Sequence, residues 1–299
     1  MTHPPVSLPP GVSLRPGRGG LDCLSVHTEA CTGEIYLHGA HVTGWQPRDS
    51  EPVVWLSGHS AFEPGKPIRG GIPICFPWFG PHPSDSSRPP HGFARLAAWT
   101  LDQVGRDADG AVGVTLSLRT DGGAPQAWPH RCRLTYTATF GRHLALELAI
   151  RNLGDAPCPV QEALHTYFAV GDIREVAVEG LAGATYVDKL RGGERFVQEQ
   201  APIRFAGETD RVYLDTAATT TIVDAARQRR IVVEKQGSRT TVVWNPWMAK
   251  ARTMPDFGDD EWPAMVCVET ANALDDALDL APGGDHRLRA VIRVERAPA

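Results

Sequence analysis

Apolar and polar residues alternate along most of the chain with a period of two residues. Such a period is typical of β-strands, whose successive side chains point to opposite faces of a sheet. Long amphipathic helical patterns are absent, and a parallel sheet would need helices alternating with its strands. We therefore predict an all-β fold, a large antiparallel β-sandwich with few short helices. The predicted strands lie in Leu21–Ala30, Glu34–Pro47, Pro52–Ser57, Ala111–Thr120, Arg131–Phe140, His143–Asn152, Thr220–Ala226, Arg230–Gln236, Thr240–Asn245, Ala264–Ala271 and His286–Arg296.

Domain organisation follows from where this pattern begins and where it is interrupted. Residues 1–20 hold prolines and glycines without alternation, so we expect a ragged N-terminal segment before one domain over residues 21–299. Two long irregular stretches, Gly58–Pro90 and Trp247–Trp262, are rich in aromatic and charged residues. Long loops in a compact domain are usually functional or mobile, so a ligand is expected near these two.

Charge and composition exclude several classes of partner. The net charge of −5, from 30 Lys and Arg against 35 Asp and Glu, provides no basic field for nucleic acid. No apolar run is long enough to span a membrane, and the N-terminus lacks an export pattern. The six cysteines are scattered without a C-x-x-C pair, which favours free buried thiols over disulfides. The sequence thus predicts a soluble, cytoplasmic protein with no membrane or nucleic-acid partner.

The segment "KPIRGGIPICFPWFGPHP", residues 66–83, places an arginine among apolar, aromatic, glycine and proline residues. Arg69 lies between Ile68 and two glycines, next to many aromatic residues, and a buried guanidinium needs either a protein carboxylate or an anionic ligand. The glycines would let the backbone bend and a ligand approach. Arg95, in "HGFAR" after His91, alone favours a surface ion pair, but with Arg69 it suggests a shared site for phosphate or carboxylate.

Three further residues could take part in proton transfer or hydrogen bonding. His165, in "LHTYF", is either a general acid or base or a hydrogen-bonded core histidine. Glu269 shares a strand face with Met265 and Cys267, where desolvation would raise its pKa toward a useful range, unless it pairs with an arginine. Asp210 is either an acceptor for a hydroxyl group or a turn residue.

Common catalytic signatures and metal motifs are missing from the sequence, including G-x-x-x-x-G-K-[ST], H-E-x-x-H and G-x-S-x-G. His38 and His41 are three residues apart on a predicted strand, so they point to opposite faces and are expected to be ordinary hydrogen-bonded histidines. Trp244, Trp247 and Trp262 offer flat faces for a sugar ring, although core packing is as common a use.

The ordered motifs "KPIRGGIPICFPWFG", "HGFAR", "LHTYF", "ETDRVY", "WNPW" and "VETA" span nearly the whole chain. Together they resemble the hexose-6-phosphate mutarotases, or glucose-6-phosphate 1-epimerases, of the galactose mutarotase-like (aldose 1-epimerase) superfamily. The resemblance implies a β-sandwich with its site in a cleft on one sheet. It also implies an isomerase that exchanges the α and β anomers of a hexose 6-phosphate, glucose 6-phosphate first, without a cofactor or metal.

The resemblance also implies roles for individual residues. His165 matches the general acid, Glu269 the general base, and Arg69 and Arg95 the residues that hold the phosphate. Asp210 matches a substrate-binding aspartate, and His91 is expected near the site. The small-molecule hexose phosphate would be the partner of a monomer. Two alternatives stay open, a mutarotase of unphosphorylated aldoses and a non-catalytic domain that binds a sugar or sugar phosphate.

Overall fold

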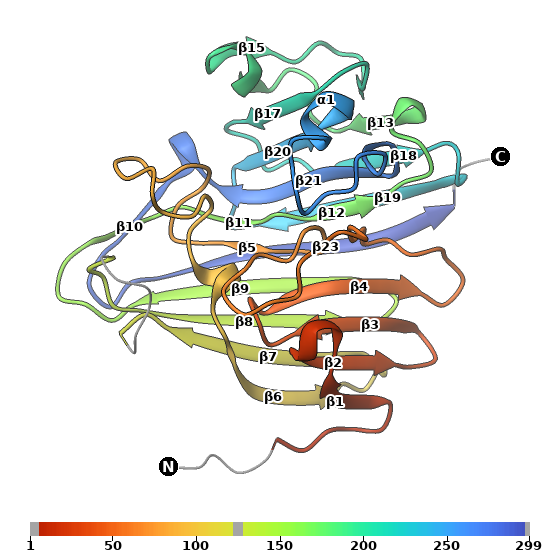
Figure 1. Ribbon diagram of the computed structural model, residues 1–299. Coiled ribbons are helices and arrows are strands. Elements are labelled where there is room, and N and C mark those ends of the chain that lie inside the picture. The colour runs from red at the N-terminus through yellow and green to blue at the C-terminus, as the bar shows by residue number, and fades with distance from the viewer. Residues whose placement is uncertain (1–5, 122–127, 297–299) are drawn as a thin grey trace.

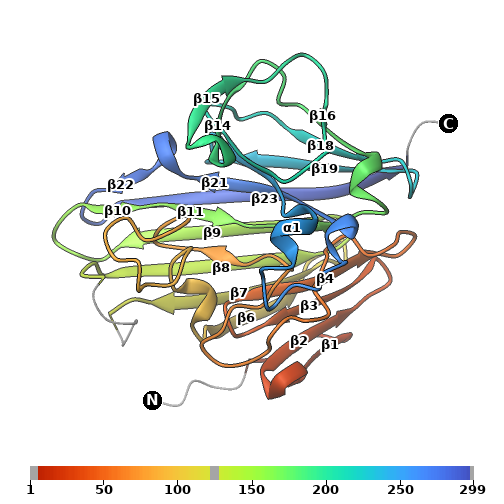
Figure 2. The same ribbon diagram turned by 45° about the horizontal axis from the view of Figure 1, so that its top comes forward.

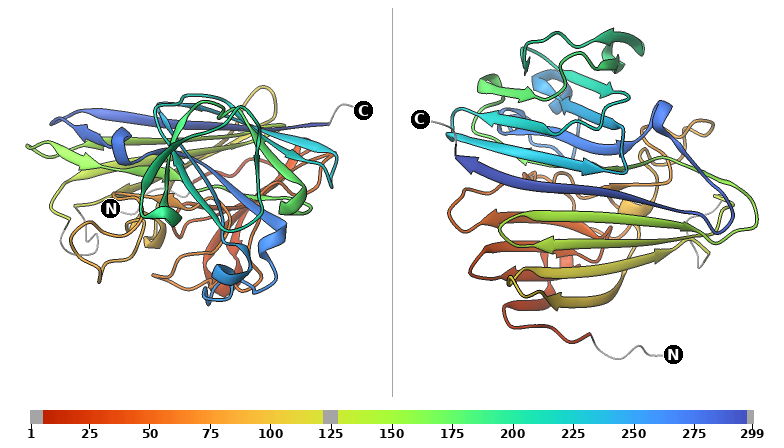
Figure 3. Two further views of the ribbon diagram at one scale, coloured as in Figure 1. Left: turned by 90° about the horizontal axis from the view of Figure 1, so that it is seen from above. Right: turned by 180° about the vertical axis from the view of Figure 1, so that it is seen from behind.

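The largest layer of the molecule is an antiparallel sheet of nine strands, seen from behind in Figure 3. The computed structural model describes residues 6–121 and 128–296. In spatial order the sheet contains β16 (Ile203–Arg204), β13 (Val176–Glu179), β18 (Thr220–Asp224), β19 (Arg229–Gln236), β23 (Asp285–Arg296), β9 (Leu144–Asn152), β8 (Cys132–Phe140), β7 (Val112–Arg119) and β6 (Thr100–Arg106). Its long strands alternate buried and exposed residues, as in β8 and β9, because one face packs against the rest of the molecule.

Two further sheets form the opposing layer (Figure 1). One has four strands in chain order, β1 (Val12–Pro16), β2 (Asp22–His27), β3 (Cys31–Tyr36) and β4 (His41–Pro47). The other has eight strands: β15 (Glu194–Val197), β14 (Thr185–Asp188), β17 (Thr209–Tyr213), β20 (Thr240–Asn245), β21 (Met265–Asn272), β11 (Glu162–Leu164) and β5 (Ile74–Cys75), with β12 (Tyr167–Ala169) also paired to β21. A short pair, β10 (Cys158–Val160) and β22 (Leu278–Leu280), lies apart.

The main core lies between these layers. It includes Trp45 from β4 and Tyr136 and Phe140 from β8, each at most 1% exposed. Gly33 of β3 faces Phe140 so closely that a Cβ atom there would lie 2.3 Å from the ring, so the two layers touch where no side chain intervenes. Burying one such large apolar side chain stabilises the fold by about 1.5–3 kcal/mol.

Helices are few and short, as expected. The one α-helix in the described residues, α1 (Trp247–Ala251), follows β20 directly. The 3-10 helices are η1 (Arg18–Gly20), η2 (Ala94–Leu96), η3 (Ile173–Glu175), η4 (Lys189–Arg191), η5 (Trp262–Ala264) and η6 (Leu274–Asp276). Figure 2 shows β14, β15 and β16 gathered at one end of the molecule, with β1 and β2 at the other. None of the helices described is long and apolar enough to cross a membrane.

The prediction of a large antiparallel sandwich is confirmed, with differences at particular segments. Part of the N-terminal segment expected to be ragged is ordered, since Val12–Pro16 pairs with β2; residues 1–5 lie outside the described part. Glu34–Pro47 forms two strands with a turn at Gly39 and Ala40, both of positive φ. Pro52–Ser57 contributes only isolated bridges. That residues 21–299 form one domain stays a prediction.

Candidate active site

The centre of the candidate site is a histidine and a glutamate on neighbouring strands. Glu269 lies on β21, whose partners include both β11 and β12. His165 stands between β11 and β12, and its backbone N–H donates to the carbonyl of Pro73 at 3.1 Å. The cross-strand register of β11 and β21 continues to His165 and Glu269, so their side chains meet. The distance between His165 Nε2 and Glu269 Oε1 is 3.3 Å.

Burial shifts the acid–base properties of both groups toward their neutral forms. Glu269 is 1% exposed and His165 is 7% exposed. Desolvation raises the pKa of Glu269 well above its usual value, and the charge of Lys189 opposes this. Desolvation lowers the pKa of His165 well below its usual value, and the positive charges of Arg95 and Arg69 lower it further. One proton shared by the pair therefore favours the carboxylic acid beside a neutral imidazole.

Aromatic rings build the surroundings of this pair. The ring of Tyr167, on β12, stacks on His165 with centroids 4.8 Å apart and planes 13° apart. The ring of Trp244, on β20, lies with its centroid 6.2 Å from that of His165. Flat faces and a half-buried indole suit a sugar ring, the use that the sequence left open for Trp244.

Arg69 lies at the site but has a protein partner. Its Nη2 forms an ion pair with Asp256 Oδ2 at 3.2 Å, and its Nη1 donates to the hydroxyl oxygen of Tyr167 at 2.9 Å. Of the two partners considered from the sequence, a protein carboxylate is therefore present. Because the same Tyr167 ring stacks on His165, Arg69 borders the acid–base pair all the same.

Two histidines hold the loop that carries Arg69. His38 Nε2 lies 2.7 Å from the carbonyl oxygen of Lys66, and His41 Nε2 lies 2.8 Å from that of Gly70. The prediction of ordinary hydrogen-bonded histidines is confirmed. Gly71 has φ +67°, and a Cβ atom there would lie 2.3 Å from His41 Nε2. The glycine bend is confirmed, and the group that approaches Gly71 closely is His41 of the protein itself.

Arg95 is a buried cation without a carboxylate partner among the described residues. It is 7% exposed, and its Nη2 donates to the carbonyl oxygen of Pro90 at 2.8 Å, while its Nε has no partner. Desolvation lowers its pKa, the charge of Arg69 adds to that effect and the charge of Asp256 opposes it, so both groups lie within electrostatic range of Arg95. The surface ion pair considered for Arg95 is therefore wrong. A buried guanidinium of this kind is stabilised by an anion.

His91 stands beside His165, with ring centroids 5.5 Å apart. Its Nδ1 accepts a hydrogen bond from the backbone N–H of Gly80 at 3.3 Å and lies 3.4 Å from Cys75 Sγ. Burial lowers its pKa well below the usual value. His91 is therefore neutral with its proton on Nε2, and it can donate one hydrogen bond.

Asp210 lies on strand β17, and its Oδ1 is 3.8 Å from Lys189 Nζ. Burial raises its pKa, and Lys189 opposes the shift. Neither Lys189 nor Asp256 was found from the sequence, because no local pattern marks either one. Tyr167 was overlooked although it lies in the "LHTYF" motif.

One group of described residues could hold a metal ion. Ligand atoms of His165, Cys267 and Glu269 lie within 4.8 Å of one another. Burial raises the pKa of the Cys267 thiol well above its usual value, whereas a metal needs the thiolate. The arrangement is better suited to moving a proton between His165 and Glu269.

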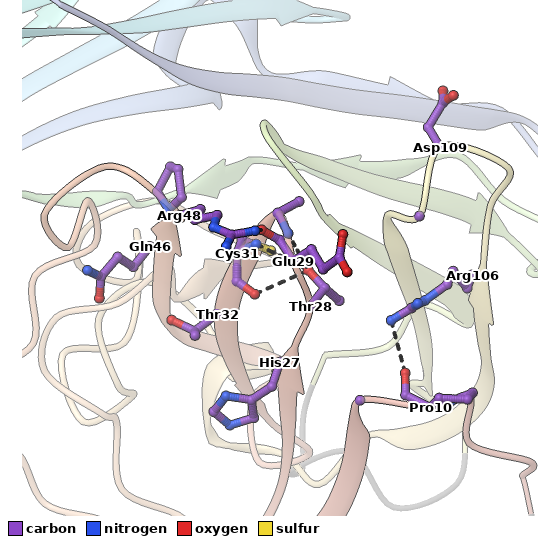
Figure 4. A pocket seen from close by; sticks show the side chains of 14 residues that line it. Pro10, His27, Thr28, Glu29, Cys31, Thr32, Gln46, Arg48, Arg106 and Asp109 are labelled. Atoms are coloured by element: carbon purple, nitrogen blue, oxygen red, sulfur yellow. Dashed lines mark hydrogen bonds between the residues drawn. The ribbon is translucent and has the colours of Figure 1, made fainter.

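A surface pocket elsewhere contains none of the predicted site residues. It is lined by residues around β2, β3 and β4, among them Thr28 and Arg48, and by Arg106 at the end of β6 (Figure 4). Arg106 donates to the carbonyl oxygen of Pro10 at 3.0 Å, and Thr28 bonds within its own turn to Cys31. These polar groups serve the local fold.

Comparisons with known proteins agree with the fold. A sequence model of the aldose 1-epimerase family matches residues 22–293. A protein of Cenchrus ciliaris named "Putative glucose-6-phosphate 1-epimerase" is 40% identical over 267 residues, 87% of this chain and 80% of its own length. A protein of Escherichia coli K12 with the same name is 39% identical over 253 residues, 85% of this chain and 84% of its own.

Solved structures show the same architecture. A crystal structure from Salmonella typhimurium described as "a putative mutarotase (YeaD)" has a TM-score of 0.90 and 34% sequence identity, and the match covers 97% of this chain and 96% of that one. The fold is that of the galactose mutarotase-like proteins, as expected. With the family match over almost the entire chain and relatives near 40% identity, the chain belongs to the aldose 1-epimerase family.

Proposed function

We propose that this protein interconverts the α and β anomers of a hexose 6-phosphate, with glucose 6-phosphate as the substrate to test first. The observation that carries the proposal is the His165–Glu269 pair, 3.3 Å apart, within electrostatic range of the buried guanidinium of Arg95, which has no carboxylate partner among the described residues. The pair can exchange protons with the anomeric centre, and Arg95 calls for an anion. The names of the relatives from Cenchrus ciliaris and Escherichia coli support the same substrate.

In the proposed reaction Glu269 accepts the proton of the C1 hydroxyl while His165 donates a proton to the ring oxygen O5. The C1–O5 bond breaks, and its electron pair goes to O5, which leaves a C1 aldehyde and a C5 hydroxyl. Rotation about the C1–C2 bond turns the other face of the aldehyde toward O5. Ring closure then reverses both proton transfers, so atoms and charges balance without another reactant.

Substrate binding itself would prepare the pair for this reaction. Without an anion, desolvation lowers the pKa of His165 and the charges of Arg95 and Arg69 lower it further, which favours the neutral pair. A phosphate dianion held by these arginines would cancel their charge, so the pKa of His165 would rise. Arg95 also lowers the pKa of Glu269, whereas Arg69 acts on His165, so the rise would be larger for His165. Substrate binding would thereby favour transfer of the shared proton from Glu269 to His165, toward the carboxylate base and imidazolium acid that ring opening needs. Lys189, which lowers the pKa of Glu269, favours the same state.

The experiment that tests this proposal is anomer exchange of glucose 6-phosphate, followed by NMR. We expect the protein to accelerate exchange above the rate in buffer, and Glu269→Gln and His165→Asn each to lower kcat by about 10²- to 10⁴-fold, the usual contribution of general acid–base catalysis.

Exposed residues of the same types provide matched controls. Glu199→Gln and His143→Asn change side chains at the surface and should leave exchange unchanged. Exchange no faster than in buffer, with correctly folded protein, would rule out the enzymatic proposal and favour a non-catalytic sugar-binding domain. Full activity of Glu269→Gln would instead remove the assigned base.

The other candidate, a mutarotase of unphosphorylated aldoses, gives Arg95 no anion to bind. It predicts that changes at Arg69 and Arg95 leave kcat/KM nearly unchanged. Arg95, 7% exposed and without a carboxylate partner in the described residues, favours the phosphorylated substrate. A monomeric state and a cytoplasmic location stay predictions.

A further inference from the structure

Lys189 is a cation at the candidate site that no sequence motif marks, and in the proposed reaction it acts only by lowering the pKa of Glu269. It begins η4, immediately after β14, whose last residue Asp188 pairs with Arg211 of β17. One step further along this register Lys189 meets Asp210, with Nζ 3.8 Å from Oδ1. The same Nζ lies 4.5 Å from the centroid of the Phe79 ring. An ion pair and a cation–π contact together fix the position of the ammonium group.

The strand registers place this ion pair on the face of the sheet that carries the acid–base pair. Asp210 is opposite Trp244 on β20, and Trp244 is opposite Cys267 on β21. Residues directly opposite each other share a face, and Glu269, two residues after Cys267, lies on that same face. The side chain of Lys189 is 31% exposed, so its ammonium group can meet a ligand.

The cations of the site fall into two groups by their effects on the acid–base pair. After desolvation, Lys189 has the largest effect on the pKa of Glu269, ahead of Asp210 and Arg95. For His165 the order differs, since Arg95 and Arg69 each have a larger effect than Lys189. The contacts agree with this order, since Arg69 bonds to Tyr167, which stacks on His165, whereas Lys189 pairs with Asp210, which the strand register connects to the face of Glu269. The guanidinium groups therefore lie toward His165 and the ammonium group toward Glu269.

This division matches the covalent structure of a hexose 6-phosphate. The ring oxygen O5 is bonded to C5, which bears C6 and the phosphate, whereas C1 is bonded to C2 on its other side. If His165 serves O5 and Glu269 serves the C1 hydroxyl, the phosphate lies toward the arginines and the C2 hydroxyl lies toward Lys189 and Asp210. The two ends of the site would then bind the two ends of the substrate.

We infer that Lys189 is a specificity residue that donates a hydrogen bond to the C2 hydroxyl of the sugar, next to Asp210 as the acceptor. The inference rests on the proposed function, because the assignment of His165 and Glu269 orients the substrate. An ammonium donor and a carboxylate acceptor side by side suit a hydroxyl group, which can accept from one and donate to the other. Lys189 would thus select substrates by their configuration at C2.

The test compares Lys189→Met with the wild type on glucose 6-phosphate and 2-deoxyglucose 6-phosphate. A hydrogen bond from a charged donor implies that removing either partner lowers kcat/KM about tenfold or more. We therefore expect that loss for wild type on the deoxy substrate and for Lys189→Met on glucose 6-phosphate. On the deoxy substrate, Lys189→Met should cost clearly less than on glucose 6-phosphate, because the partner hydroxyl is already gone and only the effect of Lys189 on the pKa of Glu269 remains.

Arg191→Met is the matched control, because Arg191 lies on the same short helix, is exposed, and stacks on Phe196 instead. It should leave both substrates unaffected. Lys189→Gln, which keeps a donor without the charge, serves if Lys189→Met fails to fold, and it should show the same dependence on the C2 hydroxyl with a smaller loss. An equal loss on both substrates, or no loss on either, would overturn the inference.

Binding measurements separate this inference from the proposed function. The non-reacting analogue 1,5-anhydroglucitol 6-phosphate keeps the C2 hydroxyl, and its 2-deoxy form lacks it. Calorimetry should show that wild type prefers the former about tenfold and that Lys189→Met does not. That result with no anomer exchange would reject catalysis and keep the role of Lys189. Anomer exchange without any preference for the C2 hydroxyl would support catalysis and reject the role of Lys189.

Discussion

Glu162 has a carboxyl group to which the described part of the fold offers no hydrogen bond. It is fully buried on β11, three residues before His165, and neither of its oxygens has a hydrogen-bond partner. His286 Nε2 lies 3.4 Å from its Oε1, and burial lowers the pKa of that histidine. Desolvation, with a smaller effect of Asp276, raises the pKa of Glu162 well above its usual value. Glu162 is therefore a neutral acid between the layers.

This shift predicts how stability depends on pH. The folded state holds the Glu162 proton more tightly than the unfolded chain does. The stabilisation from this proton is therefore fully present below the unfolded pKa and is lost as pH rises toward the folded pKa. Glu162→Gln does not titrate, so it should raise Tm relative to wild type at pH 7 to 8 and lose that advantage near pH 4.5. The measurement is thermal unfolding of both proteins across this range. A Tm difference independent of pH would show that Glu162 is not protonated in the folded state.

The chemistry of a single residue could be predicted only where its neighbours in the sequence indicate its environment. Glu269 on an apolar strand indicated a desolvated carboxyl group, and its desolvation is confirmed by its burial and raised pKa. The pairing of Arg69 with Asp256, 187 positions later, depends on two loops that meet only in the folded chain. Lys189 likewise acquires its role from the register of β14 and β17. Such long-range contacts leave no trace in local patterns.

At the scale of elements, one buried side chain fastens the loop that carries Asp256. Asn245, at the end of β20, donates to the carbonyl oxygens of Trp262 and Met265, both at 2.9 Å. Its Oδ1 accepts from the backbone N–H of Trp247, the first residue of α1, at 2.8 Å. One amide thereby joins β20, α1 and η5, and it closes the stretch from which Asp256 reaches Arg69.

Asn245→Ala should therefore affect both stability and substrate binding. Buried backbone groups left without partners cost about 1–3 kcal/mol each, so we expect a loss of several kcal/mol and a raised KM for glucose 6-phosphate. Asn152→Ala is the matched control, because Asn152 also donates to Ala156 and Leu280 and accepts from Gly154, but at the end of β9. It should lower Tm similarly without raising KM. Equal KM values for the two variants would contradict the role given to Asn245.

The strands of the sandwich were largely predictable because one face of each is buried and the other is not. Alternation located β7, β8, β9, β19, β20 and β23 within one or two residues. It failed where a strand does not have one buried and one exposed face. In β6 only Val104 is buried, and β5 is a two-residue strand inside a loop. The break between β3 and β4 was hidden because alternation continues across the turn, and Gly39 was the only local signal.

The whole molecule carries a net charge of −5, yet its candidate site gathers cations. Arg69 and Lys189 are balanced by Asp256 and Asp210, whereas Arg95 has no such partner among the described residues. The site therefore has an excess of positive charge, which suits an anionic substrate better than a neutral sugar. The sandwich explains how these residues come together, since they come from both irregular loop regions and from strands far apart in sequence.

The central claim is that the protein acts on a sugar phosphate, and the most direct measurement is the ratio of kcat/KM for glucose 6-phosphate to that for glucose. We predict a preference of about 100-fold or more in wild type, because charge-assisted hydrogen bonds from two guanidinium groups would hold the phosphate. Arg95→Met should reduce that preference to about tenfold or less, with a smaller effect on glucose. Equal values for the two sugars in wild type, or a preference unchanged by Arg95→Met, would contradict the account.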